Sequence, residues 1–299
     1  MVKKAVEQIV RVRGNVEKSF NKLEVGKLWW KNGVMPSVLI GVGVISLRKE
    51  DINKLQTLEN GIYRQILGGR SCTPIAILRG EVGSSMVITR VIQSWLVLAK
   101  SILVGENILL KQVLGNIMRT RKGCWFITFT KYLETIGISY NNFVEMDISE
   151  IKAKIREYDN KLWFDNLGDL TDRDVYKKFK SSVGRSFGYD NRFESDLLFK
   201  ARSNDLDLNI FKRHTGGDIA CVLCGAVRED LEHFLFNCQK LERVRDRTLI
   251  DRIAMSGDSV DRIGNLLFCK TYVEEVKMQL GRLWRERNTL LIIANRPRA

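Results

Sequence analysis

The spacing of three cysteines and one histidine in the last third of the chain constrains the fold more than any other feature. Cys221 and Cys224 are separated by two residues, so both side chains can point into one tight turn. Eight residues separate Cys224 from His233, and Cys238 comes five positions after His233. Three thiolates and one imidazole complete a tetrahedral shell and leave no ligand position for water or substrate. The sequence therefore predicts one structural Zn²⁺ bound by these four side chains.

The residues between the two ligand pairs support this interpretation. Residues 225–229 have the composition of a turn, and a short helix is predicted from Asp230 to Asn237, with Cys238 just beyond its end. The alternative is four unrelated side chains in a reduced core, since free cysteine is a common buried residue. Against it, three of the six cysteines and one of the two histidines fall within 18 residues. His214 can compete as a ligand, although a surface or loop position is favoured for it.

The remaining cysteines show no ligand or disulfide spacing, and we expect them to be buried thiols: Cys72, Cys124 and Cys269. The six cysteines do not form the framework of a small secreted domain, and residues 1–7 lack the apolar stretch of a signal peptide. An intracellular location, cytoplasmic or nuclear, is therefore expected. The most apolar run, residues 34–47, has 14 residues interrupted by proline and glycine, too few to span a bilayer. No membrane partner is expected.

Charge is the strongest deviation in composition. The chain has 299 residues, and its 49 Lys+Arg against 35 Asp+Glu give a formal net charge of +14. Such an excess attracts polyanions and favours nucleic-acid binding through the release of counterions. The alternative is a soluble surface whose basic charge is incidental.

The chain is predicted to be mainly α-helical. It contains only three prolines and is rich in residues that favour helices. Apolar residues recur every three or four positions from Ile52 to Ile66, which predicts an amphipathic helix that ends at Gly68. Asp147 and Glu150 form a capping-box pattern at the start of another predicted helix.

Several segments resemble reverse transcriptases of non-LTR (LINE-type) retrotransposons. In that family, a proline-led apolar segment, a helix and a Leu-Arg-Gly-Glu-Leu-Gly element follow the polymerase palm as the thumb and linker. Similar residues here are 36–41 (Pro-Ser-Val-Leu-Ile-Gly), 51–56, 64–68 and 78–83 (Leu-Arg-Gly-Glu-Val-Gly). The family's zinc-binding region is similar to Cys221–Gly225 and to Glu232–Cys238 (Glu-His-Phe-Leu-Phe-Asn-Cys). The resemblance covers roughly residues 25–100 and 193–245.

The chain departs from this family at the polymerase centre. Two-metal polymerases hold their ions with paired carboxylates, but this sequence contains no Asp-Asp dipeptide and has no room before residue 34 for fingers and palm. No Ser/His/Asp or Cys/His nucleophile set assembles either, because one of the two histidines is assigned to the metal. The chain is therefore expected to correspond to a C-terminal portion of a retrotransposon-type protein and not to be an enzyme. By the same resemblance, the chain is expected to bind RNA or DNA and to have a polymerase-bearing protein as a possible partner.

The residue pattern along the chain, together with the resemblance, suggests how the chain is organised. We expect a basic N-terminal helical segment (1–33), a thumb-like helical bundle (34–118), a helical connector (119–192), a zinc-binding module (193–256) and a C-terminal helical tail (257–299).

Two basic groups are candidates for nucleic-acid contacts: Lys212, Arg213, Lys240, Arg243 and Arg247 around the metal ligands, and Arg119, Arg121 and Lys122 beside Trp125 and Phe126. Arg243 and Arg247 are predicted to share one helix face, where they can contact adjacent phosphates. Aromatic residues beside cations can stack on unpaired bases, although such residues are more often core. The eight residues between Cys224 and His233 exceed the four of a retroviral knuckle, so direct base stacking by a knuckle does not carry over.

Two alternatives remain open for these basic residues. They can form a solvated face of mixed charge, or they can neutralise a zinc centre with three thiolates. In either case the chain is a zinc-stapled structural or protein-interaction module with no nucleic-acid role.

Overall fold

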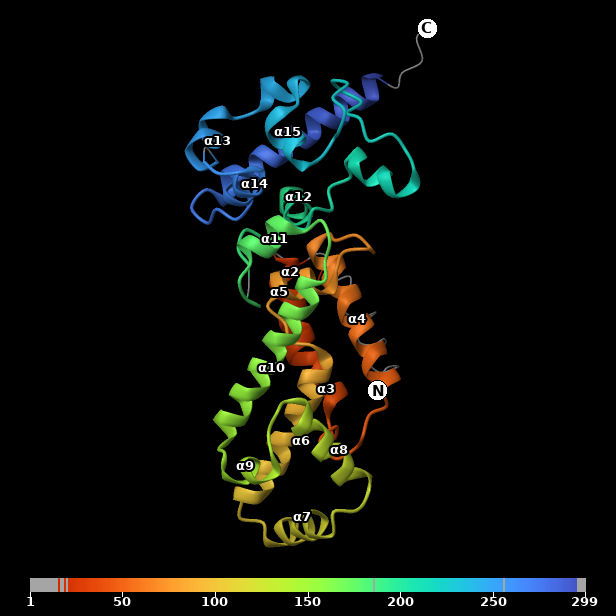
Figure 1. The fold of residues 1–299 in the computed structure, drawn as a ribbon, viewed down its shortest axis with the longest axis vertical. Coiled ribbons are helices and arrows are strands. Elements are labelled where there is room, and N and C mark those ends of the chain that lie inside the picture. The colour runs from red at the N-terminus through yellow and green to blue at the C-terminus, as the bar shows by residue number, and fades with distance from the viewer. Residues whose placement is uncertain (1–15, 17–18, 20, 185, 255, 295–299) are drawn as a thin grey trace. The chain divides into compact units, whose positions relative to one another are not determined.

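The computed structural model describes residues 16, 19, 21–184, 186–254 and 256–294. All regular elements among these residues are helices, and no strand occurs in this part of the chain (Figure 1). The prediction of a mainly α-helical fold is therefore confirmed. Two compact units are formed. Of the described residues, unit 1 contains 16, 19, 24–62 and 83–167, and unit 2 contains 21–23, 63–82 and those from 168 onwards.

These units differ from the five predicted segments. Residues 63–82 of the predicted thumb-like bundle belong to unit 2, and residues 119–167 of the predicted connector belong to unit 1. The residues described from the predicted C-terminal tail are not a tail, because their helices supply part of the core of unit 2. Contacts between residues far apart in the chain decide which segments belong to one unit. The sequence pattern of a single helix does not reveal these contacts.

Aromatic rings from helices α6, α8 and α9 form much of the core of unit 1. Its elements are η1 (Trp30–Val34), α3 (Met35–Leu39), α6 (Val87–Val104), α7 (Ile108–Thr120), α8 (Cys124–Thr135), α9 (Tyr140–Glu145) and most of α10 (Ile148–Gly168). Trp95 on α6 is fully buried and stacks on Trp125 with ring centroids 5.2 Å apart. Phe129 on α8 and Phe143 on α9 meet edge to face at 5.1 Å. Helices α2 (Lys22–Trp29) and α4 (Lys49–Leu67) contain residues of both units.

Helix α6 is long and apolar enough to cross a membrane by length and composition alone. Of its residues, 44% are buried inside the structure, among them Val91, Ile92 and Leu96 with no exposed surface. The core helix of a globular unit meets the same criterion, and the packing of α6 gives it that role in unit 1.

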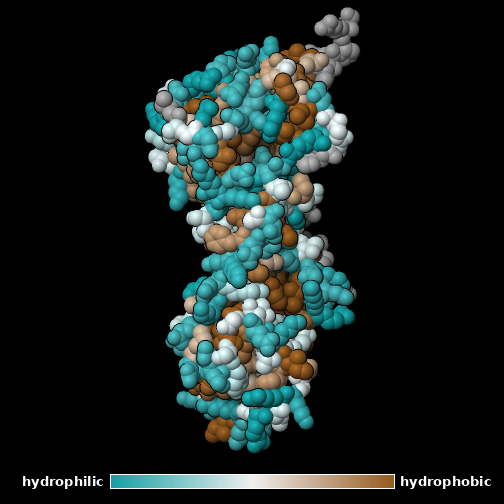
Figure 2. Space-filling model, viewed as in Figure 1, coloured by the Kyte–Doolittle hydropathy of each residue, from teal (hydrophilic) through white to brown (hydrophobic). Residues whose placement is uncertain are grey.

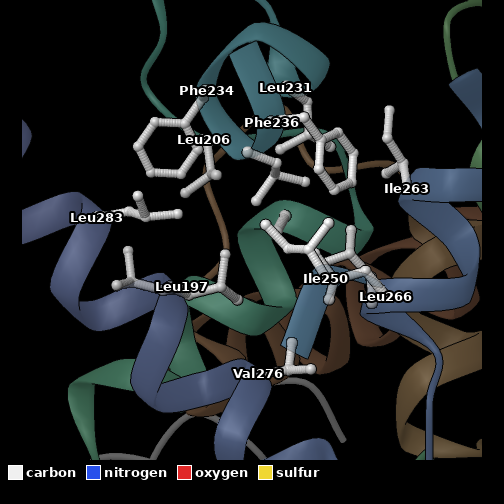
Figure 3. Close-up of a cluster of buried hydrophobic side chains, with 14 of the residues drawn as sticks. Leu197, Leu206, Leu231, Phe234, Phe236, Ile250, Ile263, Leu266, Val276 and Leu283 are labelled. Carbon is white, nitrogen blue, oxygen red and sulfur yellow. The ribbon is translucent and has the colours of Figure 1, made fainter. Parts of the chain in front are cut away.

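Unit 2 is built around α12 and α15, which pack against each other. Its elements are α5 (Ile75–Val82), α11 (Asp174–Phe179), α12 (Phe193–Arg202), η2 (Asn209–Thr215), η3 (His233–Asn237), η4 (Gln239–Val244), α13 (Arg247–Ile253), α14 (Ser259–Leu267) and α15 (Val273–Ala294). Leu197 of α12 and Leu283 of α15 share one apolar cluster with Phe234 and Phe236 of η3 (Figure 3). The segment that carries the predicted metal ligands therefore lies in the core of this unit.

Local sequence signals set several helix ends as predicted. Gly68 adopts φ +68°, and the next amide donates a hydrogen bond to the Arg64 carbonyl at 2.7 Å, which ends α4. The Asp147 amide donates to Glu150 Oε2 at 2.7 Å, and the Glu150 amide donates to Asp147 Oδ1 at 2.8 Å. These two bonds are the predicted capping box at the start of α10.

Candidate metal centre

The four predicted ligands come together in unit 2. One donor atom from each of Cys221, Cys224, His233 and Cys238 lies within 4.8 Å of the others. The Sγ atoms of Cys221 and Cys238 are 4.0 Å apart, and Cys224 Sγ is 3.3 Å from His233 Nε2. Around a tetrahedral zinc, neighbouring S···S and S···N distances are about 3.8 and 3.5 Å, from bond lengths of about 2.3 and 2.0 Å. The donor set therefore fits one tetrahedral metal ion.

A tight turn positions the first two thiols. The Gly225 amide donates to the Cys221 carbonyl at 2.8 Å, and the Cys221 amide donates to the Ala226 carbonyl at 2.8 Å. Gly225 adopts φ +73°, a conformation that glycine reaches without the steric cost of a side chain. The amides of Leu223 and Cys224 donate to the Cys221 sulfur, which favours its thiolate form.

A π-helical turn positions the second pair of ligands. Residues 231–237 are helical as predicted, but the last five form the π-helix η3. The Cys238 amide donates to the His233 carbonyl at 2.8 Å, a bond between residues five apart. In an α-helix, side chains five apart point about 140° away from each other. A π turn completes its circle over about that span, so it brings His233 and Cys238 to the same side.

Burial makes the thiolate forms of Cys221 and Cys238 unfavourable unless a positive charge lies nearby. Cys221 and Cys238 are each 1% exposed. Burial raises the pKa of the Cys221 thiol and raises the pKa of Cys238 to about 12, with the adjacent thiols adding to the effect. A bound cation offsets this cost and deprotonates the ligands. The 4.0 Å Sγ separation is twice the about 2.05 Å of a disulfide, and all six cysteines are free.

Arg245 supports the second ligand pair from a buried position. Its Nε donates to the Leu235 carbonyl at 2.9 Å, and its Nη2 donates to the Cys238 carbonyl at 2.9 Å. The third nitrogen, Nη1, pairs with Glu242. Arg245 therefore fixes the chain on both sides of Cys238 and places a cation beside its sulfur. The sequence shows only one more arginine in a basic stretch, so it gives no signal for this role.

The predicted pairing of Arg243 and Arg247 on one helix face is wrong. Helix η4 ends at Val244, and α13 begins at Arg247 with Asp246 as its N-cap, which accepts from the Leu249 amide at 3.0 Å. The buried Arg245 and the Asp246 cap break the helix between the two arginines.

Carboxylates bind all three arginines predicted for phosphate contacts in unit 2. Arg243 donates to Glu286 Oε1 at 2.5 and 3.1 Å. Arg247 donates to both oxygens of Glu242 at 2.6 Å. A third ion pair joins Arg213 and Asp172. Within the described residues, the two predicted lysines make no ion pair, and both are exposed: Lys212 and Lys240.

The other predicted basic group belongs to unit 1. Arg119, Arg121 and Lys122 are exposed at the end of α7. Trp125, beside them, stacks on Trp95 and on Phe129, so its ring is part of the core rather than free to stack on a base. Trp125 Nε1 also donates to the Gly43 carbonyl at 3.2 Å.

The expectation that the three remaining cysteines are buried is wrong. Cys72 and Cys124 are exposed, and Cys269 is half-buried. Each lies near a helix end, where the chain turns through solvent. The side chain of His214 lies outside the described part of the structure.

Comparison of the chain with protein-family models, with curated proteins and with solved structures finds no match.

Proposed function

We propose that Cys221, Cys224, His233 and Cys238 bind one structural Zn²⁺ that holds unit 2 together. The observation that carries this proposal is the convergence of the four donor atoms within 4.8 Å, two of them on buried cysteines and two on half-buried residues. Three sulfurs and one imidazole suit zinc and leave no open position for catalysis. The ion lowers the free energy of the folded state because these ligands do not converge in the unfolded chain.

Elemental analysis and native mass spectrometry test the metal. We expect one zinc per chain, lost when a chelator is added together with denaturant. Cys224→Ser should lower the zinc content, whereas Cys72→Ser, which changes an exposed cysteine of the same unit, should leave it unchanged. A purified chain that carries no metal, or that contains a Cys221–Cys238 disulfide as isolated, contradicts the proposal.

We further propose that the chain is a non-catalytic nucleic-acid-binding portion of a reverse-transcriptase-like protein. The net charge of +14 and the resemblance to LINE-type elements support this role. Since carboxylates bind the arginines near the metal, the exposed lysines Lys212 and Lys240 are the better candidates there for phosphate contacts. An intracellular location and a polymerase-bearing partner belong to the same proposal.

Gel shifts over a salt series test this role with single-stranded RNA and duplex DNA as probes. Affinity should fall steeply as salt rises, because counterions are released on binding. Lys212→Gln with Lys240→Gln should weaken binding by about tenfold, at roughly 0.7 kcal/mol for each lost contact. Arg243→Gln should weaken it less, because Glu286 already binds that arginine.

The second candidate function is a structural or protein-interaction module without nucleic-acid binding. The ion pairs of Arg213, Arg243 and Arg247 favour it, because these pairs neutralise the charge next to the metal. If the affinity for RNA and DNA does not change with salt, or if no binding occurs at low salt, this second function replaces the first.

A further inference from the structure

Helix α7 in unit 1 has an apolar face wider than its packing uses. Leu114 and Met118 are 3% and 7% exposed where α7 packs against α6. The first two turns instead leave four large aliphatic side chains in solvent: Ile108 at 71%, Leu109 at 68%, Leu110 at 46% and Val113 at 49%. Apolar side chains accordingly reach the surface over α7, at the bottom of the view in Figure 2. Large aliphatic side chains that are exposed together on one short helix are typical of an interaction site.

The charge along α7 itself is positive, although the exposed Glu106 lies directly before its N-cap Asn107. Residues 107–133, which contain α7 and most of α8, include five cations and no acidic residue. All five are exposed, and among the described residues none forms an ion pair: Lys111, Arg119, Arg121, Lys122 and Lys131. Arg119 donates a hydrogen bond to the side chain of Asn116 within the same helix. The exposed aliphatic residues and the cations therefore face solvent together, and Glu106 is the carboxylate nearest to the aliphatic residues in the sequence.

We propose that α7 binds the surface of an anionic membrane. The aliphatic side chains of its first two turns would enter the boundary between headgroups and acyl chains, and the cations would contact anionic lipid headgroups. A second copy of this chain does not fit, because the like charges of the two faces would repel each other. Nucleic acid alone does not explain the exposed leucines and valine, since phosphates offer no apolar surface.

This mode of binding differs from crossing a bilayer. The 13 residues of α7 are too short to span it, since a spanning helix needs about 20. The sequence analysis expected no membrane partner because its most apolar run is too short to span. A helix that lies in the interface has no such length requirement.

Co-sedimentation of the full chain with lipid vesicles tests the proposal. The probes are vesicles of phosphatidylcholine alone and vesicles with about one third phosphatidylserine, compared at low salt. We expect binding to the anionic vesicles only. Leu109→Ser with Val113→Ser should weaken it at least tenfold, because it removes the inserted side chains. Ile292→Ser, at a position 61% exposed on α15, is the matched control and should bind as the parent does.

A charge variant tests the role of the cations, and an RNA-binding assay on the serine variant separates lipid binding from nucleic-acid binding. Arg119→Gln with Lys122→Gln should weaken binding to the anionic vesicles by about tenfold or more, at roughly 1 kcal/mol for each cation. The Leu109→Ser and Val113→Ser variant should keep the parent's affinity for RNA while losing vesicle binding, provided that its circular dichroism is unchanged. If the parent binds neither vesicle, or if this serine variant binds anionic vesicles as tightly as the parent, the proposal is overturned. In that case an acidic protein, rather than a membrane, becomes the expected partner of α7.

Discussion

Arg287 on α15 and Glu229, in the loop between the two ligand pairs, form a buried ion pair with two hydrogen bonds. Arg287 Nε lies 2.8 Å from Oε1 of Glu229, and Nη2 lies 2.9 Å from Oε2. Glu229 Oε2 also accepts from the Asn209 amide at 2.8 Å. One carboxylate thus joins the C-terminal helix, η2 and the candidate metal loop. The C-terminal helix therefore contributes to holding the ligands in place.

Removal of one partner should cost far more than removal of an exposed arginine. Arg287→Met leaves the Glu229 carboxylate buried without its cation, and we expect a loss of about 3–5 kcal/mol in the free energy of unfolding. Arg285→Ala, at a 60% exposed side chain paired with Glu194, should cost less than about 1 kcal/mol. Urea denaturation measures both. The double variant Arg287→Met with Glu229→Gln should recover part of the loss, and equal costs for the two single arginine variants would contradict this account.

Loss of a metal ligand should unfold unit 2. Cys221→Ser removes one of the four donors proposed to bind a stabilising metal ion, so we expect its thermal transition to broaden and to move to lower temperature. Addition of a chelator should shift the parent in the same direction and leave the variant almost unchanged. Differential scanning calorimetry with and without chelator measures this difference. A variant as heat-stable as the parent would show that the four side chains hold no stabilising ion.

Two glycines, Gly61 within α4 and Gly68 directly after it, should respond to alanine in opposite ways. A Cβ on Gly61 meets nothing within 4 Å, so Gly61→Ala should stabilise the helix by about 0.5–1 kcal/mol. A Cβ on Gly68 would lie 2.5 Å from Asp196 Cγ, and its φ is +68°, so Gly68→Ala should destabilise by more than about 1 kcal/mol. Denaturant midpoints of the two variants check the signs. If both substitutions changed the stability in the same direction, Gly68 would not act as the residue that ends α4.

Protonation of Asp190 in acid should lower the free energy of unfolding. Burial opposes its ionisation, but hydrogen bonds from Arg192, Lys277 and Ser195 outweigh it and hold the pKa of Asp190 well below its ordinary value. A carboxyl with a lowered folded-state pKa stabilises the fold above its unfolded pKa of about 3.9 and loses this contribution as pH falls.

Asp190→Asn tests this effect. The variant should be less stable than the parent at neutral pH, and its free energy of unfolding should change less between about pH 4 and pH 2. Urea denaturation over this range measures both slopes. Any loss of metal in acid affects the parent and the variant alike, so the difference between them reports on Asp190. Parallel pH profiles would contradict the assignment.

Parts of the fold were predictable because their causes are local. The stripe from Ile52 to Ile66 and the glycine after it define α4, and the Asp147–Glu150 box defines the start of α10. These signals depend on interactions among a few neighbouring residues, so they can be recognised from the sequence alone. The helical break between Arg243 and Arg247 was missed because a buried arginine and a cap compete there with helix propensity.

The sequence by itself determined the mainly α-helical class and the four side chains of the candidate metal centre, since both depend on spacing along the chain. Only the tertiary structure decided which cations remain free of carboxylates. It also decided that the C-terminal helix belongs to the core, and that a π turn brings His233 and Cys238 to one side. Those features depend on groups far apart in the sequence, or on backbone hydrogen bonds that residue identity does not specify.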